Sequence, residues 1–235
     1  MVYDTVVYHP SLTRLIKFLD SSAGREKVLR LLQYLSRFLA VQQSSLLAKQ
    51  LQAQFTFVRK ILRFLKPLNH LQAAAKFYDN KLSGDSLIRY ANIVKNLAYA
   101  GYLTLDQVNL LRILKIIPVT PLSGKKIPRW TNICWFIGLL SGIVLDLRNM
   151  HLSQTRILAL LSEQEKADTD DKKLLNTAYK QRYAATRRLI WDAIDSFIVL
   201  NNLNYLHNQD GYIALGGIAT SLFGLQDLWK AASKN

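Results

Sequence analysis

The residues of this sequence that could do chemistry are few and widely spaced. Asp192 and Asp195 lie three positions apart in WDAIDSFIVL, on one face of a predicted helix. Two carboxylates at this spacing can form a general acid–base pair. No histidine or third ligand lies near them in the sequence, so we favour ion pairing with Arg187, Arg188 or a neighbouring helix over catalysis.

Other catalytic and metal-binding patterns are missing from the sequence. It contains no glycine loop of the kind that cradles phosphate, no paired-histidine metalloprotease motif and no nucleophile elbow. We therefore expect a protein that is not an enzyme, with no cofactor and no metal. The histidines are too far apart in sequence to support a metal site; they are His9, His70, His151 and His207.

The charge of the chain points to an anionic partner. The 31 Lys and Arg against 16 Asp and Glu give a net charge of +15. Residues 1–90 hold fourteen basic and five acidic residues, hence +9, whereas residues 151–235 hold ten and nine, hence +1. Such a balance favours nucleic acid or anionic lipid.

Helical periodicity runs through almost the whole chain, and no alternating run is long enough to predict a strand. We expect an all-α, membrane-associated helical bundle with amphipathic N-terminal helices and one or two hydrophobic, membrane-embedded helices. The expected segments are a basic amphipathic region (1–117), a Pro/Gly loop (118–129), a transmembrane helix (130–150), a short helix (151–161), an acidic mobile loop (162–173) and a C-terminal helical hairpin (174–235).

The stretch from Phe57 to Asn80, FVRKILRFLKPLNHLQAAAKFYDN, separates its charge from its apolar residues when it is wound as a helix. A wide apolar face opposite a basic face is typical of a helix that lies on anionic lipid. A core helix with a solvated face is the alternative, and nucleic-acid binding is weaker because no known module appears. The predicted lipid-binding residues are Arg59, Lys60, Arg63 and Lys66, and the predicted membrane-inserting residues are Val58, Ile61, Leu62, Leu65 and Leu68.

Pro67 lies inside this stretch, on the polar side of the wheel. A proline within a helix removes one backbone hydrogen bond and bends or ends the helix. The sequence allows both outcomes, a bent single helix or a boundary between Lys66 and Leu68.

The segment WTNICWFIGLLSGIVLDL, residues 130–147, has the length and composition of a membrane span. It would reach roughly 27 Å as a helix, close to the hydrocarbon thickness of about 30 Å. Lys125, Lys126 and Arg129 precede it. Gly138 and Gly142, four residues apart, provide a surface for close packing of helices. A buried helix of a soluble bundle is the alternative.

A second uncharged segment, GYIALGGIATSLFGLQ at residues 211–226, is shorter and rich in glycine. We interpret it as a possible second membrane segment, with a tight hairpin helix in a bundle as the alternative. Its small residues form ladders that suit helix packing or oligomer contacts. They are Gly216, Thr220 and Gly224 in one ladder and Gly217 and Ser221 in the other.

Five long strings of the sequence are more specific than any short motif. They are REKVLRLLQYLSRFLA (25–40), LRFLKPLNHLQAAAKFYDNK (62–81), LDQVNLLRILK (105–115), GKKIPRW (124–130) and WDAIDSFIVLNNLNYL (191–206). With these strings the chain resembles the peroxin-eleven family of peroxisomal membrane proteins, in its fungal form, and the resemblance covers nearly the whole chain.

The resemblance implies a protein that self-associates, elongates the peroxisomal membrane and promotes peroxisome proliferation and fission. It further implies a dynamin-related GTPase and a peroxisomal membrane-protein import receptor as partners, besides the anionic phospholipid membrane and further copies of the chain. The family's amphipathic helix matches Val58 to Asp79 here. The alternative function that it implies is a pore for small metabolites linked to fatty-acid oxidation, and a soluble regulatory bundle ranks third.

Overall fold

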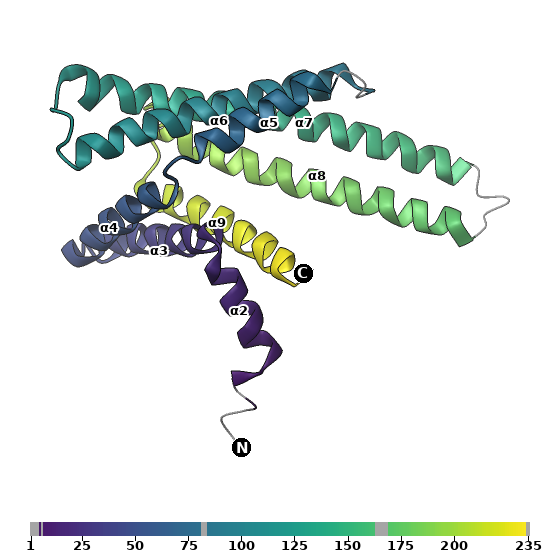
Figure 1. The fold of residues 1–235 in the computed structure, drawn as a ribbon, viewed down its shortest axis with the longest axis horizontal. Coiled ribbons are helices and arrows are strands. Elements are labelled where there is room, and N and C mark those ends of the chain that lie inside the picture. The colour runs from purple at the N-terminus through teal and green to yellow at the C-terminus, as the bar shows by residue number, and fades with distance from the viewer. Residues whose placement is uncertain (1–4, 6, 81–83, 163–168, 234–235) are drawn as a thin grey trace. The chain divides into compact units, whose positions relative to one another are not determined.

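The computed structural model describes residues 5, 7–80, 84–162 and 169–233, and every regular element among these residues is a helix (Figure 1). The predicted all-α fold is confirmed. The helices are α2 (Pro10–Asp20), α3 (Ser22–Gln42), α4 (Leu46–Leu62), α5 (Pro67–Asp79), α6 (Ser86–Ile113), the π-helical turn η1 (Leu122–Lys126), α7 (Ile127–Ser162), α8 (Thr169–Asn202) and α9 (Asp210–Ala232).

The chain folds as two compact units that are interleaved in sequence. The first unit combines Met1–Leu65, Asp106–Pro128 and Leu200–Asn235, and the second combines Lys66–Leu105 and Arg129–Val199. The predicted segments follow the chain in linear order, whereas each compact unit is assembled from separate stretches of it.

Short polar residues fix where the first helices begin. The Ser21 hydroxyl accepts a hydrogen bond from the Gly24 amide at 2.9 Å and so caps α3. Ser45 caps α4 in the same way through the amide of Ala48, at 3.3 Å. These caps satisfy amides that have no partner within the helix.

Pro67 divides the basic stretch into two helices. Helix α4 ends at Leu62 and α5 begins at Pro67, which occupies the first helical turn, where its missing N–H costs no hydrogen bond. Between them Leu65 adopts a left-handed backbone with φ of 59°. The boundary therefore exists, and the predicted lipid-binding stretch contributes α4 to the first unit and α5 to the second.

In the first unit, α3 packs against both α4 and α9, and α2 packs against α3 and α9 (Figure 1). The end of α9 anchors α2, because the Arg14 guanidinium donates to the Trp229 carbonyl oxygen at 2.6 Å. The Phe18 and Trp229 rings form a T-shaped pair, with 5.9 Å between ring centroids. Most residues that α3 buries are polar or small; the buried set is Gly24, Glu26, Arg30, Gln33, Tyr34 and Ser36.

In the second unit, α7 and α8 form a long antiparallel hairpin, and α6 packs on α7 (Figure 1). The rings of Tyr102 and Trp135 stack at 5.7 Å between centroids. Helix α7 is continuous over 36 residues and includes the segment predicted as a separate short helix at 151–161. Residues 163–168 of the predicted acidic loop lie outside the described residues, and α8 begins at Thr169, before that loop was expected to end.

One helical segment among the described residues, Leu122–Ser162, is long and apolar enough to cross a membrane. It contains the predicted span at 130–147. The second predicted segment, 211–226, forms most of α9 and does not meet the same measure of length and hydropathy. Instead, α9 turns its small residues toward α3.

Candidate functional site

The basic residues of α4 face inward, toward carboxylates of the first unit. The Arg59 guanidinium donates to Oε1 of Glu26 from Nε at 2.9 Å and from Nη2 at 2.7 Å. Its Nη1 donates to the amide oxygen of Gln33. Arg59 is 9% exposed and Glu26 5% exposed. This charge pair is therefore part of the core between α3 and α4.

The Glu26–Arg59 pair stays ionised despite its burial. Burial by itself would raise the pKa of Glu26, but the positive charges of Arg59, Lys27 and Arg63 outweigh it and lower that pKa to about 2. The surroundings of Glu26 therefore stabilise its ionised form.

A second ion-pair group holds the last turn of α4. The Arg63 guanidinium donates to Oδ2 of Asp106 at 2.9 Å, and the Lys60 ammonium donates to Oδ1 of the same carboxylate. Asp106 is 6% exposed and comes from the part of α6 that belongs to the first unit. Lys66, the fourth predicted lipid-binding residue, is half-buried at the start of the second unit.

The apolar residues of the same helix face outward. Val58 is 39% exposed and Ile61 45% exposed, whereas Leu62 is half-buried. Leu65, in the turn that follows α4, is 57% exposed, and Leu68, in the second unit, is 59% exposed. The structure thus places all five predicted membrane-inserting residues at least partly at the surface.

Helix α3 shows the same inversion, so the first unit carries an apolar surface over a charged interior. We call this the outer apolar surface. Large side chains at this density on the outside of a soluble protein mark a contact with membrane or protein. On α3, on α4 and in the turn that follows α4, the surface consists of Leu32, Leu35, Leu39, Val41, Leu46, Leu47, Leu51, Val58, Ile61 and Leu65, each 38% exposed or more.

The small residues of α9 let α3 approach closely. A side chain on Gly217 would overlap the ring of Tyr34. The Thr220 hydroxyl accepts from Arg30 at 2.9 Å, and the Ser221 hydroxyl donates to the Gly217 carbonyl oxygen at 2.5 Å. Gly224 is buried as well, and Gly216 is half-buried.

The glycines of α7 serve the second unit in the same way. A Cβ on Gly138 would lie 3.3 Å from the Tyr99 ring of α6. A Cβ on Gly142 would overlap the Asp192 carboxylate of α8. These two glycines and the α9 ladder therefore provide helix contacts within one chain, and their predicted role between chains stays a prediction.

The Asp192 carboxylate pairs with cations from two helices. Arg188 Nη2 lies 3.2 Å from Oδ1, and Lys95 Nζ of α6 lies 3.9 Å from Oδ2. Asp195 accepts a hydrogen bond from the Trp191 indole at 3.1 Å. Ion pairing with Arg188 and a neighbouring helix, favoured from the sequence over a catalytic pair, is confirmed.

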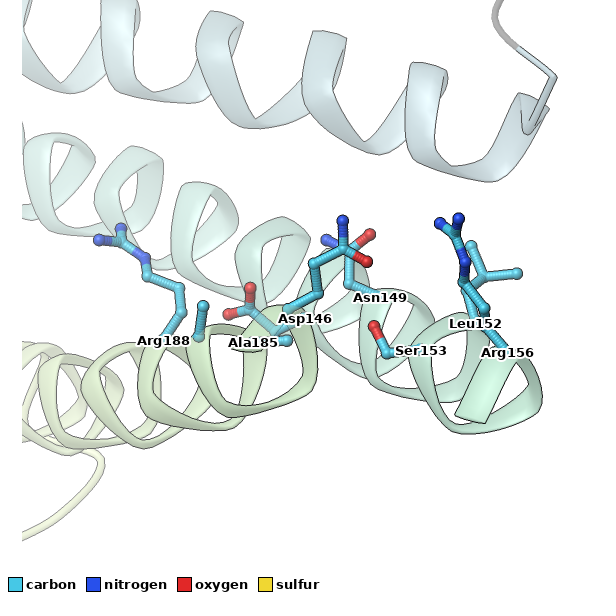
Figure 2. Close-up of a pocket in the computed structure, with 9 residues that line it drawn as sticks. Asp146, Asn149, Leu152, Ser153, Arg156, Ala185 and Arg188 are labelled. Atoms are coloured by element: carbon cyan, nitrogen blue, oxygen red, sulfur yellow. The ribbon is translucent and has the colours of Figure 1, made fainter. Parts of the chain in front are cut away.

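A pocket of about 510 Å³ lies along the α7–α8 hairpin (Figure 2). Its buried floor holds Asp146, which is 6% exposed and whose Oδ2 has no hydrogen-bond partner. Figure 2 shows Asp146 between Arg188 and Arg156 along the pocket. The other polar lining residues are Asn149 and Ser153 of α7 and Gln181 of α8.

The sequence contained a signal for this pocket that the helix-by-helix interpretation missed. Asp146, Asn149, Ser153 and Arg156 follow the spacing of one helix face, directly after the apolar run. Of the inward partners of α4, Asp106 gave a weaker signal as an acidic residue within an apolar run, whereas Glu26 lies between Arg25 and Lys27 and gave none. Among the described residues, no group of three or more His, Cys, Asp or Glu could hold a metal ion.

Comparison with known proteins identifies the relatives of this chain. Residues 12–229 match the family model of peroxisomal biogenesis factor 11 (PEX11). The chain is 66% identical to the peroxisomal membrane protein PMP27 of Saccharomyces cerevisiae, over 98% of this chain and 100% of that protein. It is 39% identical to PMP30A of Candida boidinii, over 98% and 99%, and 26% identical to peroxisomal biogenesis factor 11 of Schizosaccharomyces pombe, over 94% and 96%. No solved structure matches.

Proposed function

The chain belongs to the PEX11 family of peroxisomal biogenesis factors, and we propose that it remodels the peroxisomal membrane by burying its outer apolar surface in one leaflet. It is a peroxisomal membrane protein that takes part in peroxisome proliferation and division. The observation that supports our mechanism is the inversion of α3 and α4, which turn leucines outward and charges inward.

The energetics of this surface favour lipid over water. Burying one large aliphatic side chain contributes about 1.5–3 kcal/mol when it is fully removed from water. Ile61 and Leu65 are about half exposed, so each contributes part of this free energy when lipid covers it. The contributions of several such residues add up. A protein surface half-sunk in one leaflet expands that leaflet and bends the bilayer.

The basic residues of α4 have a smaller part in this proposal. Arg59, Lys60 and Arg63 already hold carboxylates of their own unit. Binding to lipid phosphate requires exchange of these partners, and Lys66 belongs to the second unit. We therefore propose that attraction to anionic lipid guides the first approach and that the apolar surface supplies most of the affinity.

We further propose that the protein acts by assembly and without catalysing a reaction. Copies associate in the membrane, a dynamin-related GTPase completes fission, and a peroxisomal membrane-protein import receptor delivers the chain. Most of the small residues predicted to mediate self-association are in contact within one copy. The names of the relatives refer to membrane and biogenesis, so we do not favour the pore.

Vesicle tubulation by the purified full chain tests the mechanism. We expect a triple variant Val58→Ser, Ile61→Ser and Leu65→Ser to bind and tubulate vesicles at least tenfold less, because it removes apolar area without touching the ion pairs. The matched control carries Val58→Ile, Ile61→Val and Leu65→Met, and should behave as the native chain. Equal tubulation by the serine variant would refute the proposal.

The salt dependence of vesicle binding separates electrostatic attraction by the basic residues from burial of the outer apolar surface. Raising the salt concentration from about 0.1 M to 1 M shortens the screening length from about 10 Å to 3 Å. We expect the initial rate of vesicle binding to fall and the bound amount at equilibrium to change little. Loss of most of the bound protein at high salt would instead assign the affinity to the basic residues.

A further inference from the structure

The connection between α6 and α7 carries cations that are free to meet a partner from outside. Lys125 and Lys126 end the π-helical turn η1, and both side chains are exposed. Neither ammonium forms an ion pair or a hydrogen bond with any residue that the structure describes. The basic residues of α4 differ, since Arg59, Lys60 and Arg63 already hold carboxylates of their own unit.

The sequence around these two lysines contains no acid that could neutralise them locally. The stretch 107–145 has no Asp or Glu. A surface with one sign of charge attracts a surface of the opposite sign. The basic residues of the stretch are Arg112, Lys115, Lys125, Lys126 and Arg129.

The backbone before the lysines is held in a fixed turn by one inward hydroxyl. Ser123 is 4% exposed. Its Oγ donates to the Pro118 carbonyl oxygen at 2.8 Å and accepts from the Thr120 amide at 2.8 Å. The two lysines therefore start from an ordered turn that has a defined inner side.

The outer side of the same turn exposes aliphatic side chains. Val119 is 74% exposed and Leu122 50% exposed. A Cβ on Gly124 would lie 3.6 Å from Cγ1 of Val119, so this side chain lies next to the residue that precedes Lys125. Aliphatic groups beside lysines suit a lipid surface better than a nucleic acid, which is bound through exposed aromatic side chains and hydrogen-bonding groups.

The place of the lysines relative to α7 suits the head groups of a bilayer. The apolar run begins at Trp130, four residues after Lys126, which is about 6 Å along a helix. The head-group layer is roughly 5–8 Å thick on each side of the hydrocarbon. A membrane-inserted α7 therefore holds Lys126 among the lipid head groups, on the water side of the apolar run.

We propose that Lys125 and Lys126 form the site at which the protein docks electrostatically on an anionic leaflet, with Val119 and Leu122 entering the lipid beside them. A lysine ammonium is a point charge without the fixed fork of arginine, so the site responds to the charge density of the leaflet and not to one head group. The inference rests on the proposed membrane remodelling and assigns its first, charge-guided approach to this connection.

The initial rate of vesicle binding by the full chain tests the site. Vesicles of phosphatidylcholine with and without phosphatidylserine are compared. We expect the variant Lys125→Gln and Lys126→Gln to bind anionic vesicles about tenfold more slowly, because opposite charges speed association, and to bind neutral vesicles at the native rate. The variant Lys125→Arg and Lys126→Arg should keep the native rate on both. A native rate of the glutamine variant on anionic vesicles would overturn the proposal.

The matched control removes the same charge elsewhere. Lys172 and Lys180 of α8 are also exposed, and Lys172→Gln with Lys180→Gln should leave the rate on anionic vesicles within about twofold of native, since charges far from the docking site are screened. Equal slowing by both glutamine variants would assign the effect to net charge and overturn the site. Circular dichroism confirms that each variant keeps its helix content.

Two arms test what the lysines recognise. Phosphatidylinositol in place of phosphatidylserine, at equal vesicle charge, should give the same rate, and a strong preference for either lipid would overturn recognition by charge density. Inorganic phosphate should slow docking no more than chloride does at equal ionic strength. Stronger inhibition by phosphate would show a site for a single phosphate group and overturn the proposed surface.

The aliphatic side chains have a separate readout. We expect Val119→Ser and Leu122→Ser to leave the association rate on anionic vesicles unchanged and to speed dissociation severalfold, because they remove apolar contact and no charge. The matched control, Val119→Ile and Leu122→Met, should dissociate as the native chain does. Unchanged dissociation of the serine variant would refute the entry of these side chains into lipid.

This inference and the proposed function fail in different ways. Equal native rates on neutral and anionic vesicles would overturn electrostatic docking and leave remodelling by the outer apolar surface intact. Native tubulation by the serine variant of Val58, Ile61 and Leu65 would refute remodelling by that surface, whereas a slower rate of the Lys125 and Lys126 variant on anionic vesicles would still support docking.

Discussion

The two units of this protein bury carboxylates in opposite ways. In the first unit, Glu26 and Asp106 are matched to cations by close hydrogen bonds from Arg59, Arg63 and Lys60. In the second unit, both oxygens of Asp192 lack a hydrogen-bond partner, although cations lie near them, and Oδ2 of Asp146 lacks one as well.

Buried carboxylates with and without hydrogen-bond partners should respond differently to substitution. A buried ion pair with complete hydrogen bonds is costly to disrupt, because removal of one member leaves the other charge unmatched. A buried carboxylate with an open oxygen beside a pocket is already unmatched, so its removal should cost little. The stability of variants in the two units should therefore differ strongly.

The largest expected effect is that of Glu26→Gln. The substitution leaves Arg59 charged and buried, and we expect the free energy of unfolding to fall by about 3 kcal/mol. Chemical denaturation of the full chain in a neutral detergent measures it. The double variant Glu26→Met and Arg59→Met should recover most of the loss, because no charge is left buried. A loss under about 1 kcal/mol would contradict the comparison.

The acid stability of the protein should follow the same carboxylate. The pKa of Glu26 is lowered from 4.5 to about 2 in the folded chain, so its contribution is complete above about pH 4.5 and is lost as the pH falls toward 2. We expect stability to drop by up to about 3 kcal/mol across this window. The measurement is denaturation at a series of pH values. If the unfolding free energy of Glu26→Gln falls with pH as steeply as that of the native chain, Glu26 is not the source of the acid sensitivity.

A smaller effect is expected at the contact between α3 and α9. Gly217→Ala should lower the free energy of unfolding by about 1–3 kcal/mol, because the added methyl overlaps the Tyr34 ring. Gly84→Ala is the matched control, since a methyl there meets no atom within 4 Å. Thermal unfolding followed by circular dichroism compares the two. Equal melting temperatures would show that α3 and α9 can move apart at no cost.

The smallest effect should come from Asp146→Asn. The carboxylate already lacks a partner for Oδ2, so the change in unfolding free energy should stay within about 1 kcal/mol. The same denaturation experiment as for Glu26→Gln measures it. A loss as large as that of Glu26→Gln would mean that the Asp146 carboxylate stabilises the fold. The buried carboxylates of the two units would then not differ.

The parts of the fold that depend on local signals could be predicted from the sequence. Pro67 acts on its immediate neighbours, and of the two outcomes that the sequence allowed, the structure has the helix boundary. The helical wheel also correctly separated Arg59 and Arg63 from the apolar residues. A wheel does not say which of two faces points outward, so the inward direction of the arginines was not predicted.

The candidate pocket and the charge clusters depend on contacts between distant residues. Lys95 of α6 pairs with Asp192 of α8, and Glu26 of α3 pairs with Arg59 of α4. Nothing local in the sequence identifies such partners. Only the α7 side of the pocket has a local signal, the spacing of Asp146, Asn149, Ser153 and Arg156.

The outward-facing leucines of α3 and α4 have a consequence for regulation. A chain with this surface exchanges poorly with the aqueous phase, so copies meet by diffusing in two dimensions and their encounter rate depends on their number per unit of membrane area. When the organelle enlarges at a fixed copy number, this surface density falls. We therefore expect membrane growth to dilute the assembly that drives it, which makes proliferation self-limiting until more of the protein is made.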